Sequence, residues 1–193
     1  IITAGGKYYW DFFDFNLPLA FYLTSGSGLL AKIFLINPII ALEIFSNLVG
    51  IFTIYFSARI LRSSEIYKDI TLFNILILSF ACGFFLRVFT LQFNEFGTKS
   101  TYFLAFAYTY ISYHLIAENR LKTFDQVLIG FLAALIFCLK PHYGILVIAF
   151  EVKKLLEKKS LKAGFCLRNY ITFSLLLAYL LLLFTAFPEY LQL

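Results

Sequence analysis

Long apolar runs separated by short polar loops occur along most of the chain. Four of these runs predict membrane-spanning helices, at residues 37–60, 70–88, 102–118 and 170–187. A run of about 20 apolar residues has the length that a helix needs to cross the hydrocarbon core of a bilayer. Pro38 fits the start of the first helix, since proline is tolerated in a first helical turn. The pattern therefore predicts an all-α, polytopic membrane helix bundle.

The apolar segment 127–152 differs from these four because Lys140, Pro141 and His142 interrupt its middle. Proline breaks the helical hydrogen-bond ladder and disfavours helix in the residue before it. Two arms of about 10–13 residues remain, and each is too short for a full crossing. The segment therefore predicts a re-entrant-like hairpin of two short helices, with its apex deep in the membrane near the outer face. A single helix kinked at Pro141 is the alternative, because membrane helices tolerate proline.

Residues 17–36 are also apolar, but Lys32 and the polar run from Thr24 to Gly28 interrupt them. Serine and glycine in succession are typical of turns. We therefore expect two short helices joined by a turn and lying in the plane of the membrane interface.

The composition agrees with a membrane protein. Of the 193 residues, 61% are hydrophobic and 14% are charged, and the mean hydropathy is +0.84. Soluble domains carry about a quarter charged residues. We expect a single transmembrane domain over residues 1–193, with an external loop and interfacial helices at 1–36 and membrane spans at 37–187. The chain has no methionine and stops just after its last span, so we expect it to be a truncated part of a larger membrane enzyme.

Positive charge is concentrated in three loops along the chain. Cytoplasmic loops of membrane proteins carry such an excess of Lys and Arg, which predicts a multi-pass protein of the plasma or inner membrane. The opening stretch and the loop 90–101 then lie outside the cytoplasm. Because these cations flank apolar spans, the net charge of +5 does not indicate a nucleic-acid partner. Eleven of the sixteen Lys and Arg residues lie in the three loops, at positions 59, 62, 68, 120, 122, 153, 154, 158, 159, 162 and 168.

Five other basic or ionisable side chains are candidates for binding a phosphate. Lys140 and His142 are placed at membrane depth by the hairpin, and ionisable groups there are candidates for function. A lysine can hold a phosphate as a compact cation, and histidine can exchange a proton near neutral pH. Lys140 reaching out to the membrane interface is the alternative. Lys7, Arg87 and Lys99 form a possible basic rim on the same side, or are solvated loop residues.

Asp11 and Asp14 lie among aromatic residues in the opening stretch "GGKYYWDFFDFNLPL". Three residues apart, they would share one face of a helix. Desolvation by aromatic neighbours disfavours the charged carboxylate and raises its basicity, which suits a general base. The alternatives are carboxylates in a solvated loop and an aromatic belt at the membrane interface.

Metal and nucleotide motifs are missing from the sequence. Cys82, Cys138 and Cys166 lie in or beside apolar runs without the spacing of a zinc site, and we interpret them as buried free thiols. Gly-rich phosphate loops and the common hydrolase motifs are also absent. Whether a divalent metal is needed stays open.

Three stretches of the sequence resemble membrane glycosyltransferases of the GT-C type. The opening "GGKYYWDFFDFNLPLAFYL" is similar to the first external loop of the dolichyl-phosphate-mannose protein mannosyltransferase and aminoarabinose transferase group, although Leu17 replaces the first proline of a Pro-Pro-Leu motif. The segment "GFLAALIFCLKPHYGILVIAFE" resembles the hairpin of that group. The loop "FGTKS" resembles a Phe-Gly-Gln-Arg-Glu stretch of some bacterial members.

The resemblance implies a hexosyl- or pentosyltransferase that moves a sugar from a polyprenyl-phosphate carrier to an acceptor glycan, lipid or protein outside the cytoplasm. The family's main catalytic carboxylate would precede Ile1. Asp11 and Asp14 would then be secondary carboxylates that contact sugar, acceptor or metal. Lys140, His142 and Lys99 would stabilise the departing lipid phosphate.

Two other functional classes fit the same pattern. A transporter or lipid flippase would also place a broken helix at mid-membrane. An external aromatic loop with two aspartates has less use in a transporter. A scaffold subunit without catalysis is the third interpretation.

Overall fold

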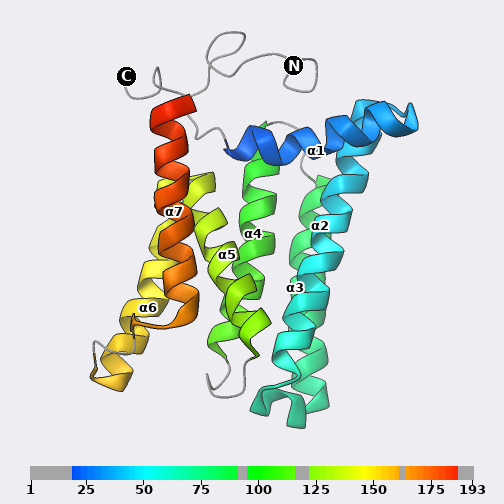
Figure 1. The fold of residues 1–193 in the computed structure, drawn as a ribbon. Coiled ribbons are helices and arrows are strands. Elements are labelled where there is room, and N and C mark those ends of the chain that lie inside the picture. Colours follow the sequence, from blue (N-terminus) through cyan, green and yellow to red (C-terminus); the bar gives the residue numbers. More distant parts are fainter. Residues whose placement is uncertain (1–18, 91–94, 116–121, 161–163, 187–193) are drawn as a thin grey trace.

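The computed structural model describes residues 19–90, 95–115, 122–160 and 164–186, and these ranges are helical without any strand. The expectation of an all-α fold is therefore confirmed (Figure 1). Two short 3-10 helices also occur, at Glu65–Lys68 and Pro141–Tyr143. The seven α-helices of these ranges are α1 (Leu19–Phe34), α2 (Pro38–Leu61), α3 (Ile70–Thr90), α4 (Glu95–His114), α5 (Thr123–Leu139), α6 (Gly144–Lys158) and α7 (Leu167–Ala186).

Helices α2 to α7 run alternately up and down, and α1 lies across one end of them (Figure 1). Helix α2 packs against α1, α3 and α4, and α5 packs against α4 and α7. We call the end that carries α1 the α1 end. The opposite end, where α2, α4 and α6 finish, is called the basic end. The turn between α5 and α6 lies in the half of the bundle nearer the α1 end.

The expected hairpin is present, and the alternative of a single kinked helix is wrong. Helix α5 ends at Leu139, Lys140 has extended backbone (φ −154°, ψ 131°), and α6 returns toward the basic end. A residue before proline favours this extended conformation. With 17 and 15 residues the arms are longer than expected, because helix continues past the apolar run into the polar residues at both ends. Their lengths, about 25 and 22 Å, still fall short of a 30 Å hydrocarbon core.

Two expectations about the α1 end need correction. Residues from Leu19 to Phe34 form one helix instead of two joined by a turn. The hydroxyls of Ser25 and Ser27 donate to carbonyl groups of their own helix, so the polar run does not interrupt it. A side chain at Gly26 would meet the Phe45 ring, so this glycine lets α1 approach α2 closely.

The loop expected at 90–101 is mostly helical. Helix α3 continues to Thr90 and α4 begins at Glu95, so the third apolar run starts its helix seven residues before the expected position 102. The polar residues 95–101 extend α4 beyond the apolar run, and hydrophobicity alone did not reveal them. Lys99 therefore lies in a helix, within the first two turns of α4.

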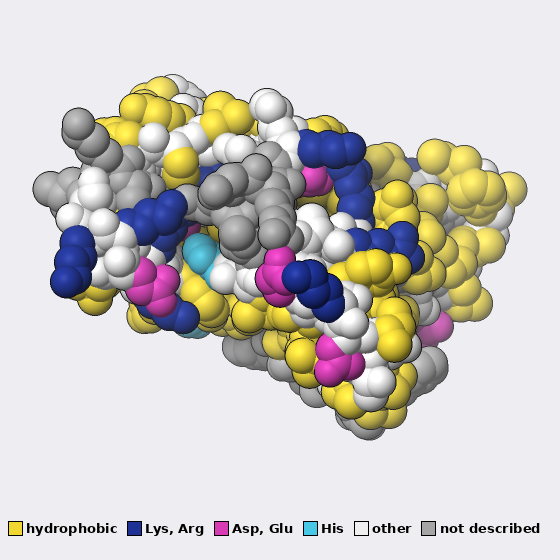
Figure 2. Space-filling view, turned by 90° about the horizontal axis from the view of Figure 1, so that it is seen from below, with side chains coloured by type: hydrophobic (Ala, Val, Ile, Leu, Met, Phe, Trp, Pro, Cys, Tyr) yellow, Lys and Arg dark blue, Asp and Glu magenta, His cyan; other side chains and the backbone are white. Residues whose placement is uncertain are grey.

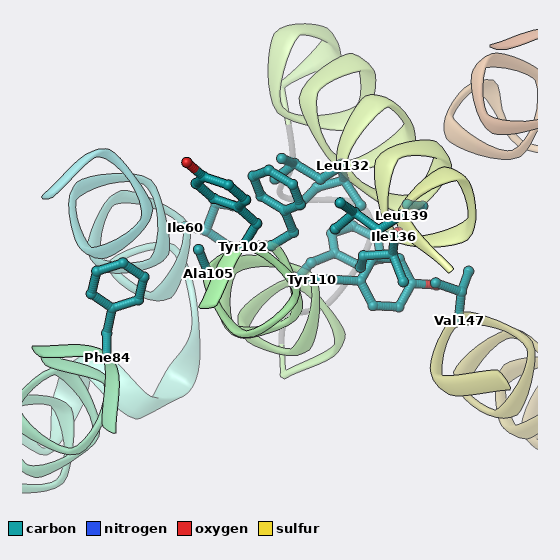
Figure 3. Packing of buried hydrophobic residues seen from close by; sticks show 13 residues of the cluster. Ile60, Phe84, Tyr102, Ala105, Tyr110, Leu132, Ile136, Leu139 and Val147 are labelled. Atoms are coloured by element: carbon teal, nitrogen blue, oxygen red, sulfur yellow. The ribbon is translucent and has the colours of Figure 1, made fainter. Parts of the chain in front are cut away.

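The apolar core lies between α4 and its neighbours (Figure 3). Tyr102 and Tyr110 of α4 are almost completely buried. The Tyr102 ring lies edge-on to Phe45 of α2, with ring centroids 6.3 Å apart. Tyr110 lies toward Ile136 of α5 and Val147 of α6. Helix α4 is thus the central helix that joins α2 to the hairpin.

Small and hydroxyl residues bring the helices into close contact. The hydroxyls of Ser57 and Thr109 lie 3.3 Å apart between α2 and α4. Thr172 of α7 donates to the carbonyl oxygen of Gly130 in α5 at 3.0 Å. Such contacts are frequent between helices in membranes, where small residues allow close approach.

A methyl group at Gly130 is expected to separate α5 from α7. Its Cβ would lie 2.5 Å from the carbonyl oxygen of Arg168 and 3.0 Å from Cβ of Ile171. Gly130→Ala should therefore destabilise the protein by about 1–3 kcal/mol through overpacking. Thermal unfolding in detergent measures the effect. Gly164→Ala is the control, because the nearest atom to its added methyl is 3.5 Å away. Equal midpoints for the two variants would contradict the prediction.

Candidate functional site

The apex of the α5–α6 hairpin carries Lys140, His142 and Tyr143. Lys140 is half-buried and His142 is exposed. The Lys140 ammonium lies 5.9 Å from the centre of the Tyr143 ring, within the range of a cation–π contact. The His142 ring stands edge-on to the same ring, with centroids 4.6 Å apart. A cation and a titratable ring therefore flank one aromatic side chain.

The position of the apex is fixed by packing against α4. The Tyr143 ring stacks on Phe103 of α4 with centroids 4.1 Å apart and an interplanar angle of 20°. The backbone amide of Tyr143 donates to the carbonyl oxygen of Lys140 at 2.9 Å, which closes the turn. The Phe137 ring packs against the backbone of Gly144, where a side chain would collide with it. The apex is therefore anchored through aromatic contacts while its polar groups stay accessible.

The other predicted site residues are less fully described. Asp11, Asp14 and Lys7 lie outside the described residues. Arg87 belongs to the last turn of α3 and Lys99 to the start of α4, and both helix ends lie at the α1 end. The fold thus brings their backbone to the end of the bundle nearer the hairpin apex.

A buried polar cluster near the basic end was missed by sequence reasoning. Its centre is the ion pair between Glu151 of α6 and Arg168 of α7, with a shortest distance of 2.7 Å. Arg168 is only 2% exposed, although the sequence placed it in a cytoplasmic loop. Tyr110 donates to the Glu151 carboxylate at 3.0 Å, and Asn169 donates to it at 3.0 Å. Arg168 also donates to the Tyr113 hydroxyl and lies over that ring.

His114 completes this polar cluster. Its Nε2 lies 3.7 Å from a Glu151 oxygen, and its ring stacks on Phe150 at 4.7 Å. Tyr110, Tyr113 and His114 are spaced three and four residues apart, so they share one face of α4. That spacing, together with a single carboxylate at Glu151 in an apolar arm, was the available signal in the sequence.

The polar cluster ties three helices together. The Glu151 carboxylate accepts hydrogen bonds from α4 and α7, and its Arg168 partner is bidentate. Both charges have partners, as burial requires. The arrangement fixes α6 against α4 and α7 and has the character of a structural anchor.

A second ion pair near the basic end joins α2 to α5. Arg59 lies 2.9 Å from a carboxylate oxygen of Asp125. The Arg59 guanidinium also lies 5.2 Å from the centre of the Phe124 ring. Asp125 is in the first turn of α5, where the helix dipole favours a negative charge.

No group of three His, Cys, Asp or Glu side chains suited to a metal ion occurs within the described part of the chain. Cys82, Cys138 and Cys166 are free thiols. Cys138 is buried as expected, whereas Cys166 is half-buried and Cys82 is exposed, so the expectation of buried thiols is wrong for Cys82.

Comparisons with family models, with curated proteins and with solved structures found no match for this chain.

Proposed function

We propose that the chain is an integral membrane protein that crosses the bilayer several times. Two described helical segments have the length and apolar composition for a crossing, Pro38–Leu61 of α2 and Leu167–Thr185 of α7. Shorter apolar segments are Ile70–Leu86 of α3 and Thr123–Leu139 of α5. Within the most apolar stretch of each crossing segment, only 22% of the residues are buried in α2 and only 11% in α7. The core helix of a soluble protein would be mostly buried, and large exposed apolar surfaces promote aggregation in water. Surrounding lipid would cover these surfaces.

The distribution of charge supports placing the basic end in the cytoplasm. Seen from this end, Lys and Arg side chains are spread across the molecule (Figure 2). The described Lys and Arg residues at this end belong to the predicted cytoplasmic loops and to the helix ends beside them. The hairpin apex and α1 would then lie toward the outer face. This is the orientation that the positive-inside rule favours.

The orientation can be tested by labelling single cysteines. Cys82, Cys138 and Cys166 are first replaced, and a cysteine is then introduced at Leu35 or at Ser160. Leu35 lies at the α1 end and Ser160 at the basic end, and both are exposed. A membrane-impermeant thiol reagent should label Leu35→Cys in intact cells and Ser160→Cys only after permeabilisation. Labelling of both in intact cells would contradict the proposed orientation.

The function we propose is sugar transfer from a polyprenyl-phosphate donor at the outer face. The supporting observation is the helix break that holds Lys140, half-buried beside His142, in the half of the bundle away from the basic end. A cation there could meet the lipid phosphate of a donor whose tail stays in the bilayer. The preorganised charge would stabilise the phosphate as it departs.

The proposed reaction is a displacement at the anomeric carbon of the sugar. The acceptor oxygen forms a bond to that carbon while the bond to the phosphate oxygen breaks. A carboxylate takes the acceptor's proton, and Lys140 and His142, with Lys99 and the basic rim of Arg87 and Lys7, stabilise the phosphate that leaves. Asp11 and Asp14 would act as secondary carboxylates that contact the sugar or the acceptor.

A transfer assay distinguishes this function from transport. The full-length protein in detergent is mixed with a radiolabelled polyprenyl-phosphate sugar and candidate acceptors. Label on the acceptor supports an enzyme, because detergent leaves no second compartment. The broken helix at the apex also suits a transporter or lipid flippase. Label that stays on the lipid in detergent but crosses the bilayer of proteoliposomes would favour that alternative.

A further inference from the structure

The C-terminal end of α6 and the start of α7, both at the basic end, form an exposed surface that the proposed chemistry does not use. We call it the α6–α7 corner. Its lysines are exposed, and its apolar members, Leu156 and Phe165, are each 71% exposed. Figure 1 shows the end of α6 extending away from the rest of the bundle. The α6–α7 corner consists of Lys153, Leu156, Lys158, Lys159, Phe165 and Tyr170.

The apolar part of the α6–α7 corner continues along α6. Exposed apolar side chains repeat at Ile145, Ile148, Val152 and Leu156, so they follow one outward face of the helix. At the start of α7, the rings of Phe165 and Tyr170 lie 6.4 Å apart and are exposed. An apolar face that ends in aromatic and basic side chains is the pattern of a membrane–water interface.

The charge of the α6–α7 corner is strongly positive. From residue 152 to 170 the sequence has six Lys or Arg residues and one acidic residue, Glu157. Two of the six are directed inward, since Arg168 pairs with Glu151 and Lys154 is buried near Cys166. Glu157 lies 3.7 Å from the exposed Lys153. Such exposed pairs are weak, so this lysine can exchange its partner for another anion.

We propose that the α6–α7 corner binds the headgroups of anionic phospholipids in the cytoplasmic leaflet. The lysines supply charge complementary to the lipid phosphates, and Leu156, Phe165 and Tyr170 enter the boundary between headgroups and acyl chains. An acidic soluble partner would match the charge but would not account for the apolar face that continues toward the membrane interior. The proposal depends on the membrane placement above and is independent of the sugar-transfer chemistry.

The test uses the full-length protein reconstituted in phosphatidylcholine bilayers. Electron paramagnetic resonance measures how strongly the protein immobilises spin-labelled phosphatidylglycerol relative to spin-labelled phosphatidylcholine. The wild-type protein should prefer phosphatidylglycerol. The triple variant Lys153→Gln, Lys158→Gln, Lys159→Gln should lower this preference by about fivefold or more, because each lysine near an anionic surface contributes roughly that factor.

A matched control removes the same charge elsewhere at the basic end. Arg62, Lys68 and Lys122 are also exposed and lie outside the α6–α7 corner. Their triple replacement by glutamine should lower the preference less than replacement of the three lysines of the α6–α7 corner does. An equal loss in both triple variants, or no preference in the wild-type protein, would overturn the proposal. Absence of any immobilised lipid would instead contradict the membrane placement.

Discussion

Replacing Arg168 by leucine is expected to destabilise the protein more than any other single change considered, by about 3–5 kcal/mol. The substitution removes the ion-pair partner of Glu151 and leaves that carboxylate in a largely buried position. Tyr110 and Asn169 can still donate to it, but neither supplies a positive charge. Unfolding by titration with a denaturing detergent, followed by circular dichroism, measures the loss.

Two further variants separate this effect from ordinary loss of a contact. Glu151→Gln combined with Arg168→Leu removes both charges and should recover much of the stability, since no charge is then buried alone. Arg59→Leu breaks an ion pair with Asp125 in which the Arg59 side chain is partly exposed, so a smaller loss is expected. If Arg168→Leu and Arg59→Leu destabilise the protein equally, the polar cluster is not the anchor that its geometry indicates.

The helices and the hairpin could be predicted because each depends on local sequence. Apolar runs and the Lys140–Pro141 step determine where helices form and where they break. The helix boundaries were less predictable. Polar residues such as Glu95 and Asp125 extend α4 and α5 beyond their apolar runs, and Asp125 is held by a tertiary contact with Arg59.

The contacts at the hairpin apex and within the polar cluster depend on tertiary packing, so local sequence patterns did not reveal them. Tyr143 is distant in sequence from Phe103, and its stacking arises only when the hairpin packs on α4. Arg168 has the local context of a loop cation that precedes a membrane span. Its burial follows from the position of Glu151 on the returning arm of the hairpin. Charge counting places such a residue near one membrane face but gives no information about its partner.

Helix α6 connects the apex with the polar cluster. It begins directly after the apex residue Tyr143, and Glu151 lies in its middle. At 1.5 Å per residue, Glu151 is about 12 Å along the helix from Tyr143. Anchoring Glu151 near the basic end and Tyr143 on α4 therefore fixes α6 at two points. A side chain at the apex can then keep one position relative to α4, as a preorganised phosphate site requires.

Removing the charge of Lys140 is expected to abolish sugar transfer while the fold is retained. Lys140→Met keeps most of the length of the side chain but cannot stabilise a departing phosphate. The loss of one preorganised electrostatic group typically lowers the rate about 10²–10³-fold. Single-turnover transfer from a radiolabelled polyprenyl-phosphate sugar measures the rate, and the thermal midpoint reports on the fold. Lys140 is half-buried and lies outside the buried core, so the midpoint should change little.

The matched control for this prediction is Lys32→Met, which removes one positive charge from the last turn of α1 at the same end of the bundle. General attraction of an anionic substrate would be weakened equally in both variants. A site at the apex predicts a large loss for Lys140→Met alone. If transfer by Lys140→Met remains within about twofold of wild type, a difference below 1 kcal/mol, Lys140 does not stabilise the reacting phosphate. The donor phosphate would then have to be held by other groups, such as His142 or the basic rim.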